Sequence, residues 1–202
     1  MSPARSLAAL AVLGALAHTA YAGVCFTAGG VGINTLNFTV SAVNTTLPNS
    51  STAGAPLGWG LALGSASARG SWWLIDPAYD PIYYAAHNTL SLTDGVLTEA
   101  YPAVFKSAPV SPGSALMTAN ADQLAGAAPE DSYCVVAPAV WGARPKLAVK
   151  GRTDKFAICH YEAGTPFAQA VVVYDGDSVP GSDAGAPDCY KVDLYVDVDV
   201  AH

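Results

Sequence analysis

The chain has 202 residues, of which 51% are hydrophobic and only 12% are charged, and its 16 acidic and 9 basic side chains give a formal net charge of −7. An acidic balance argues against proteins that bind nucleic acid or an anionic membrane through positive charge. The length suits one domain.

Residues 1 to 22 have the organisation of a secretory signal peptide. Arg5 supplies the basic start, Leu7 to Ala17 form the apolar stretch, and Ala20-Tyr21-Ala22 is a small-x-small cleavage site. The apolar stretch is shorter than the roughly 20 residues of a membrane span. We therefore expect a secreted protein without a membrane anchor, whose residues 23–202 form a single β domain.

The first half of this domain predicts short strands. Alternating polarity marks Leu36 to Val43 as a strand, and Trp59 to Leu63 and Ser71 to Ile75 read as a pair of strands joined by small residues. The clearest hairpin is Asn88 to Tyr101, because Asp94-Gly95 at its centre suits a two-residue turn with positive φ angles.

The second half continues the pattern. Leu147 to Lys150 and Phe156 to His160 flank Gly151 to Asp154 and predict a second hairpin. Strands are also expected around Ala103 to Lys106 and at Tyr133 to Ala137, and a short helix would fit only at Ala119 to Ala127.

The last two strands differ in character. Phe167 to Tyr174 is apolar at every position but one or two, so it should lie deep in the fold. Val192 to Val200 alternates, with Asp193, Tyr195 and Asp197 on its wet face.

These elements predict an all-β fold, an antiparallel β-sandwich of about ten to twelve short strands. A β-trefoil-like barrel is the alternative, since the hairpins at Asp94 and Arg152 resemble copies of one unit. A trefoil needs three copies and no third is found, so the sandwich ranks first.

Four cysteines follow the signal segment, and four allow three pairings. We favour a Cys159–Cys189 bond, which would tie the Phe156 strand to the last strand, and this leaves Cys25 with Cys134. No two cysteines stand at Cys-x-x-Cys spacing, so no metal site and no cofactor are expected.

Three N-glycosylation acceptors lie within fifteen residues, at Asn37, Asn44 and Asn49. They fall in a segment that is almost free of charge, where attached glycans would supply solubility.

Catalytic signatures are absent. The sequence contains neither Gly-x-Ser-x-Gly nor Asp-Thr/Ser-Gly. A glycosidase needs only two suitably spaced carboxylates, so that one class of enzyme stays open while a non-enzyme is expected.

Aromatic residues near turns are the candidates for carbohydrate binding, because sugar rings stack on such side chains. The candidates are Trp72, Trp73, Trp141, Tyr83 and Tyr84. Trp72 and Trp73 are adjacent on a strand and must point to opposite faces, so only one of them can pack into a given core.

The chain resembles small secreted fungal proteins of unknown activity and, more distantly, the PhiA-like fungal cell-wall proteins. The likeness to the PhiA-like proteins is carried by Leu147-Ala-Val-Lys-Gly151, Phe156-Ala-Ile-Cys159, the aromatic strand that follows and Asp188-Cys189. It covers about the last third of the chain well. The resemblance implies an extracellular or cell-wall protein without known catalysis.

The sequence therefore predicts a glycosylated, disulfide-bonded, non-enzymatic protein of the cell wall or extracellular surface. The alternative is a secreted carbohydrate-binding, lectin-like module or effector. A cell-wall polysaccharide is the expected partner, nucleic acid and membrane are not, and no residue pattern indicates an oligomeric state.

Overall fold

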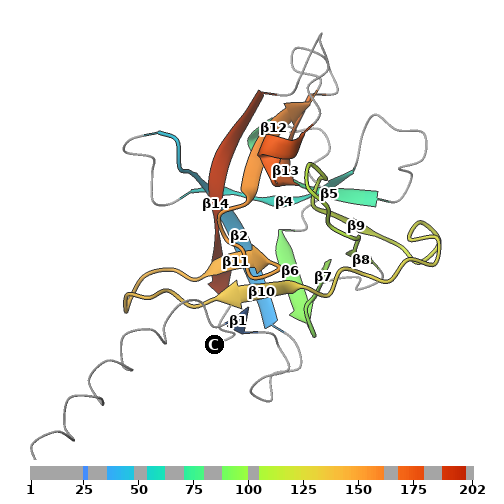
Figure 1. The fold of residues 1–202 in the computed structure, drawn as a ribbon, viewed down its shortest axis with the longest axis horizontal. Helices are drawn as coiled ribbons and strands as arrows, with labels where there is room; N and C mark the ends of the chain where they lie inside the picture. The colour runs from blue at the N-terminus through green and yellow to red at the C-terminus, as the bar shows by residue number, and fades with distance from the viewer. Residues whose placement is uncertain are drawn as a thin grey trace, which may run out of the picture.

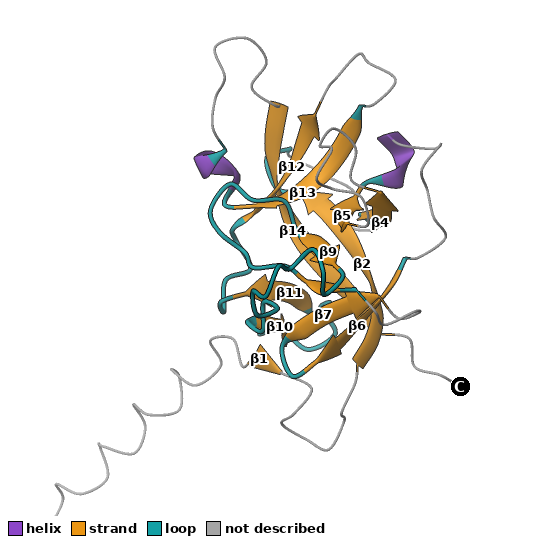
Figure 2. Ribbon diagram, turned by 90° about the vertical axis from the view of Figure 1, so that its right-hand side faces the viewer, coloured by secondary structure: helices purple, strands orange, loops and turns teal. Residues whose placement is uncertain are grey.

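The computed structural model describes residues 25–26, 36–47, 54–61, 71–79, 88–99, 105–161, 168–179 and 188–198. Within them the chain forms 14 antiparallel strands and two short 3-10 turns, so the prediction of an all-β fold is confirmed (Figures 1 and 2). The predicted signal peptide lies outside the described residues.

The strands are, in chain order, β1 (Cys25–Phe26), β2 (Leu36–Asn44), β3 (Ala55–Pro56), β4 (Gly58–Leu61), β5 (Ser71–Ile75), β6 (Thr89–Thr93), β7 (Val96–Glu99), β8 (Lys106–Ser107), β9 (Met117–Ala119), β10 (Tyr133–Val136), β11 (Lys146–Val149), β12 (Phe156–Tyr161), β13 (Gln169–Tyr174) and β14 (Asp188–Val198). The 3-10 turns are η1 (Pro77–Tyr79) and η2 (Gly176–Ser178). Several strands have only two or three residues, which is why there are more of them than the sequence predicts.

Strand β14 is the longest and lies at the centre of the pairing. Its first half pairs with β12, from His160 opposite Asp188 to Phe156 opposite Val192, and its second half pairs with β2. It also meets β11 where Lys146 lies opposite Tyr195. Figure 1 shows β14 running through the middle of the fold beside β2, β11 and β12.

The pairings form a closed circuit of strands. The order β14-β12-β13-β5-β9-β8-β7-β6-β2 returns to β14, and two of its links rest on single residue pairs, Val171 with Ile75 and Thr98 with Lys106. The sandwich stays the predicted arrangement of these strands, and the trefoil-like barrel stays the alternative.

The alternating polarity along β2 and β14 places their apolar side chains in the core, as the sequence predicts. Val40 and Ala42 on β2 lie opposite Val196 and Leu194 on β14, in one buried cluster that also contains Phe38, Trp59 and many leucines. Burying each large side chain contributes about 1.5–3 kcal/mol. Strand β13 is buried at every position, in agreement with its expected depth.

The hairpin predicted around Asp94-Gly95 is confirmed. Thr93 lies opposite Val96, and φ is 50° at Asp94 and 82° at Gly95. Two positive φ angles define the type I′ turn, whose twist matches that of the strands.

The second predicted hairpin is wrong in its pairing. Val149 and Arg152 do exchange backbone hydrogen bonds around a tight turn with positive φ at Lys150 and Gly151. After this turn the chain leaves β11. Strand β12 pairs with β14 at five consecutive positions and does not pair with β11. The sequence predicts the tight turn, but it does not show that β12 pairs with β14 instead of β11.

The short helix considered for residues 119–127 is also wrong. Asn120 O accepts hydrogen bonds from the amides of Gln123 and Leu124, which begins a helical turn. Ala125 and Gly126 then adopt positive φ angles of 48° and 84°, which end it at once.

Candidate functional site

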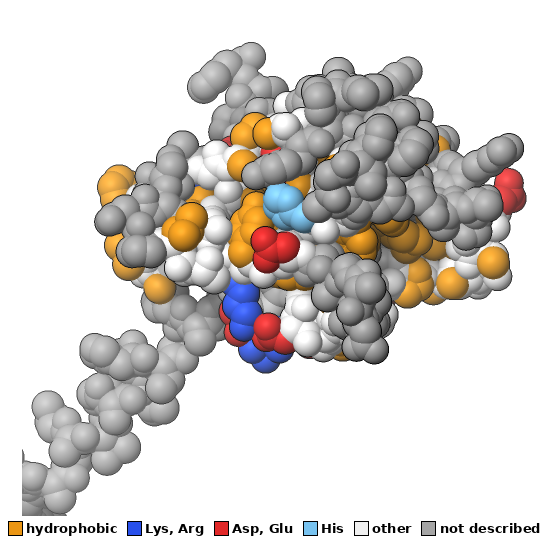
Figure 3. Space-filling view, turned by 90° about the horizontal axis from the view of Figure 1, so that it is seen from above, with side chains coloured by type: hydrophobic (Ala, Val, Ile, Leu, Met, Phe, Trp, Pro, Cys, Tyr) orange, Lys and Arg blue, Asp and Glu red, His pale blue; other side chains and the backbone are white. Residues whose placement is uncertain are grey.

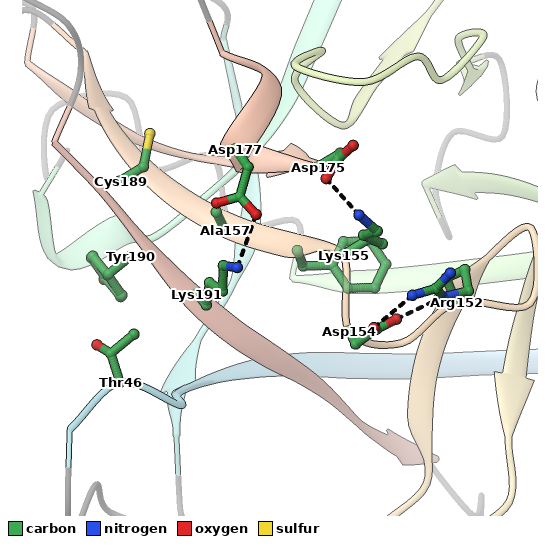
Figure 4. Close-up of a pocket in the computed structure, with 12 residues that line it drawn as sticks. Thr46, Arg152, Asp154, Lys155, Ala157, Asp175, Asp177, Cys189, Tyr190 and Lys191 are labelled. Carbon is green, nitrogen blue, oxygen red and sulfur yellow. Dashed lines mark hydrogen bonds and ion pairs between the residues drawn. The ribbon is translucent and has the colours of Figure 1, made fainter.

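A hollow of about 360 Å³ lies where β12, β14 and the η2 turn meet. We call it the ion-pair cleft, because six charged side chains line it: Arg152, Asp154, Lys155, Asp175, Asp177 and Lys191. Thr46 and Tyr190 line one end of it. Figure 4 shows the three pairs formed by these six charges.

Each cation of the cleft is neutralised by a carboxylate. Lys155 Nζ lies 2.9 Å from Asp175 Oδ1, and Lys191 Nζ lies 2.9 Å from Asp177 Oδ2. Arg152 donates from Nε and Nη2 to the two oxygens of Asp154, at 2.8 and 2.7 Å. The cleft thus presents three cationic donors and three carboxylate acceptors, and the six charges sum to zero.

The same hydrogen bonds keep the acids ionised. The bond from Arg152 lowers the pKa of Asp154 to about 2, and the bond from Lys155 lowers the pKa of Asp175 below its usual value. Carboxylates held in this way stay charged at neutral pH. They are poor proton donors for a reaction.

Local backbone geometry brings these charges together. Asp175 adopts a φ of 53° and its amide donates to Lys155 O, while Ser178 Oγ donates to Asp175 Oδ2 at 3.1 Å. Gly176 must be a glycine, because a Cβ there would lie 2.4 Å from the Cβ of Ala157. The η2 turn therefore packs directly onto β12, and this contact sets the depth of the cleft.

Tyr190 separates the cleft from a second hollow of about 250 Å³, which we call the Asn44 groove. Its lining is mostly apolar and comprises Ala42, Val43, Asn44, Leu47, Gly54, Ala55, Ile158, Tyr190 and Val192. The ring of His160 lies 5.9 Å from that of Tyr190. In the view from above, acidic and basic side chains adjoin one another beside an area of hydrophobic side chains (Figure 3).

The three predicted carbohydrate-binding aromatics that the structure describes, Trp72, Trp73 and Trp141, are not brought together. Trp72 packs against the core with its ring 6.3 Å from Phe105, and Trp73 on the opposite face lies 6.0 Å from Tyr161. This confirms that the two adjacent tryptophans serve different surroundings. Tyr83 and Tyr84 lie outside the described residues.

Trp141 differs from Trp72 and Trp73, since it is 99% exposed. It lies in the loop between β10 and β11, which projects from the body of the protein on the side away from β5 (Figure 1). Trp141 and the tryptophans of β5 therefore do not form one binding platform.

The disulfide predicted between Cys159 and Cys189 is present. The two residues lie directly opposite each other on β12 and β14, with their Cα atoms 4.1 Å apart. Cys134 is also disulfide-bonded. The side chain of Cys25 lies outside the described residues, so the Cys25–Cys134 pairing stays a prediction.

Two of the three predicted glycosylation acceptors can be placed. Asn37 is exposed on β2 and accepts a hydrogen bond from Ser91 Oγ. Asn44 ends β2 and caps an Asx turn, in which its Oδ1 accepts from the amide and the hydroxyl of Thr46 at 2.8 and 2.7 Å. Asn49 lies outside the described residues.

The ion-pair cleft was missed by reasoning from sequence. Arg152 and Lys155 belong to a run of basic residues, and Asp175 and Asp177 look like turn residues. Only the register of β12 against β14, with Ala157 opposite Lys191, shows that they converge. Their charges are balanced by pairing, so the basic run forms no free positive patch.

Two surveys of the described residues complete the description of the site. No group of three or more histidine, cysteine, aspartate or glutamate side chains is arranged to hold a metal ion there. None of the helical turns in that part of the chain is long and apolar enough to span a membrane.

No protein-family model, curated protein or solved structure matches this chain. The class that the described fold defines is a disulfide-bonded all-β domain with an electrically balanced polar cleft.

Proposed function

We propose that this chain is a secreted, glycosylated, non-enzymatic protein of the fungal cell wall or extracellular surface, related to the PhiA-like cell-wall proteins. The observation that carries the proposal is the Cys159–Cys189 bond between the central strand and β12. Disulfides of this structural kind persist in oxidising compartments and are rare in the cytosol. The acceptor at Asn44, at a strand end and beside the surface, supports the same compartment.

The electrostatics of the cleft support a non-enzymatic role. A glycosidase needs one carboxyl group with a raised pKa facing the substrate, to act as the general acid. The cleft carboxylates Asp154 and Asp175 have lowered pKa values. Glu99, whose pKa is raised, lies on the core face of the β6–β7 hairpin.

Cell fractionation tests this proposal. Antibodies against the folded domain should detect the protein in the culture fluid or the wall fraction. Its mobility should increase after enzymatic deglycosylation, and its cysteines should resist alkylation unless a reductant is added. Detection only inside the cell, with thiols that react at once, would contradict the proposal.

A second candidate function is the binding of a neutral carbohydrate in the ion-pair cleft. The observation in its favour is that Tyr190 lines the same cleft as three donor–acceptor pairs. Sugar hydroxyl groups can donate to Asp177 and accept from Lys191, while a ring packs on the tyrosine. Because the charges are balanced, an uncharged glycan suits the cleft better than an acidic one.

Calorimetric titration with neutral chitin and glucan fragments and with an acidic polyuronide tests the second function. We expect saturable binding of a neutral glycan, reduced at least tenfold by Asp177→Ala or Lys191→Ala. Trp141→Ala is the matched control, and it should bind as the wild type does. A flat titration across the panel would remove this function while leaving the first one standing.

A further inference from the structure

The Asn44 groove lies at an open end of the core, and the strand register shows which side chains line it. Directly opposite residues of antiparallel strands point to the same face. Asn44 lies opposite Val192, and Val192 lies opposite Phe156, which is buried in the core. Tyr190 lies opposite Ile158 on that same face, so the asparagine shares the groove with a mostly apolar floor.

The Asx turn fixes the side chain of Asn44. Both of its hydrogen bonds to Thr46 use the Oδ1 atom. Neither uses Nδ2, the atom to which an N-linked glycan is joined. The acceptor nitrogen is thus presented from the wall of the groove by a side chain that has already lost much of its rotational freedom.

The groove also offers apolar surface beyond the core. Leu47, three residues after Asn44, is 60% exposed, and Tyr190 is partly exposed beside it. A sugar ring has an apolar face of C–H groups, which gains free energy when it covers an aromatic or aliphatic side chain. A glycan that starts at Asn44 can cover this surface at little further entropic cost, because it is already tethered.

We propose that the Asn44 groove is the seat of the N-linked glycan of Asn44, whose first sugar packs on Tyr190 and Leu47 and stabilises the fold. The inference rests on the proposed function in one respect, that the chain is secreted and N-glycosylated. It goes further, because it gives one of the three acceptors a structural role and assigns the occupant of the groove.

Asn37 provides an internal control. It belongs to the same strand and the same type of acceptor triplet, but it alternates with Phe38 and so points away from the core face. It is not part of the lining of the groove. A glycan at Asn37 therefore starts outside the Asn44 groove and does not depend on its lining.

The experiment uses the full chain secreted from a eukaryotic host. Glycopeptide mass spectrometry gives the occupancy of each acceptor. Two background proteins are compared, one with Asn44 as its sole acceptor (N37Q/N49Q) and one with Asn37 as its sole acceptor (N44Q/N49Q). Each is trimmed to its first sugar and then stripped completely, and the Tm is measured after each step.

In the protein with the Asn44 acceptor, trimming to one sugar should preserve the Tm, and removal of that sugar should lower it by about 2–4 °C. The loss should fall to less than half in the Tyr190→Ala and Leu47→Ser variants and persist in Tyr190→Phe, which keeps the ring. The protein with the Asn37 acceptor should show no change. Leu47→Ser changes an exposed side chain, so it remains informative if Tyr190→Ala fails to fold.

Three outcomes would overturn the inference. The first is an unoccupied Asn44 in a protein glycosylated elsewhere, and the second is an equal loss of Tm with and without the tyrosine ring. The third is binding of an added saccharide or peptide in the groove with the same affinity in the presence and in the absence of the Asn44 glycan. In each case the proposed function survives, whereas an unglycosylated protein confined to the cytosol would remove both.

Discussion

Glu99 lies directly opposite Leu90 in the β6–β7 hairpin, so its carboxyl group shares a face with the core leucines. The side chain is 2% exposed, and its Oε1 has no hydrogen-bond partner among the described residues. Burial away from water raises its pKa from 4.5 to about 7.

The stability of the protein should therefore fall as the pH rises through the slightly acidic range. The unfolded carboxyl ionises near pH 4.5, whereas the folded one keeps its proton to about pH 7. Between these values the native state binds more protons, so the free energy of unfolding should decrease by up to about 3 kcal/mol as the pH rises from 4.5 to 7. Denaturant unfolding across this range measures it.

Glu99→Gln should abolish that decrease, because the amide does not ionise. Asp122→Asn, at an exposed carboxylate, is the matched control and should keep the pH profile of the wild type. A Gln variant with an unchanged profile would show that another group causes the dependence.

The cross-strand disulfide should contribute a large part of the stability. Replacing both Cys159 and Cys189 with alanine releases a loop closed across 30 residues. Without the cross-link the unfolded chain gains conformational entropy, which predicts a destabilisation of about 3–4 kcal/mol. Chemical denaturation of the double variant measures this, and an unfolding free energy equal to that of the wild type would refute it.

Gly95 should tolerate no side chain. Its φ is 82°, and a Cβ would lie 1.9 Å from the backbone oxygen of Asp131. Gly142 has a similar φ of 84° with nothing within 4 Å of its Cβ position. Gly142→Ala should cost about 1 kcal/mol from backbone strain alone, and Gly95→Ala about 3 kcal/mol or more. Equal losses in thermal or denaturant unfolding would mean that the contact with Asp131 has no role.

Arg144 should matter to stability far more than Arg152. Its guanidinium donates to both oxygens of Asp197 and, at 2.6 Å, to Ser41 Oγ, and it lies 5.0 Å from the centre of the Tyr195 ring. These contacts join the β10–β11 loop to β14 and β2.

Arg144→Ala should cost about 1–2 kcal/mol, and Arg144→Lys should recover less than half of that, since lysine cannot make the paired bonds. Arg152→Ala breaks a local, exposed pair with Asp154 and should leave the unfolding free energy unchanged. Equal unfolding free energies of Arg144→Ala and Arg152→Ala would contradict this prediction.

Much of the fold was predictable because strand alternation is local. The faces of β2 and β14 follow from period-two patterns, and the type I′ turn follows from Asp94-Gly95. The position of Glu99 in the hairpin could also be predicted from the sequence, because a two-residue turn between Thr93 and Val96 places Leu90 opposite Glu99. The deep placement of β13 follows from its unbroken apolar run from Ala170 to Val173.

Long-range pairing was not predictable from local patterns. The chain between Val149 and Phe156 has the signature of a hairpin, yet β12 gains more by pairing along β14 than by returning to β11. The ion-pair cleft depends on that choice, since Lys191 and Asp177 meet only when β12 and β14 are in register. Trp141 likewise gives no sign in the sequence that it is wholly exposed.

Strand β14 pairs along one edge of β2, yet it is synthesised much later. The hydrogen bond between Thr45 and Lys191 joins residues that are 146 positions apart in the sequence. Until the last strand emerges, the core side chains of Phe38, Val40 and Ala42 lack the β14 residues that pack beside them, and the edge of β2 that pairs with β14 has no partner. Because an unpaired strand edge can pair with another chain, we expect the incomplete chain to be prone to association and the pairing of β14 to be a slow step of folding.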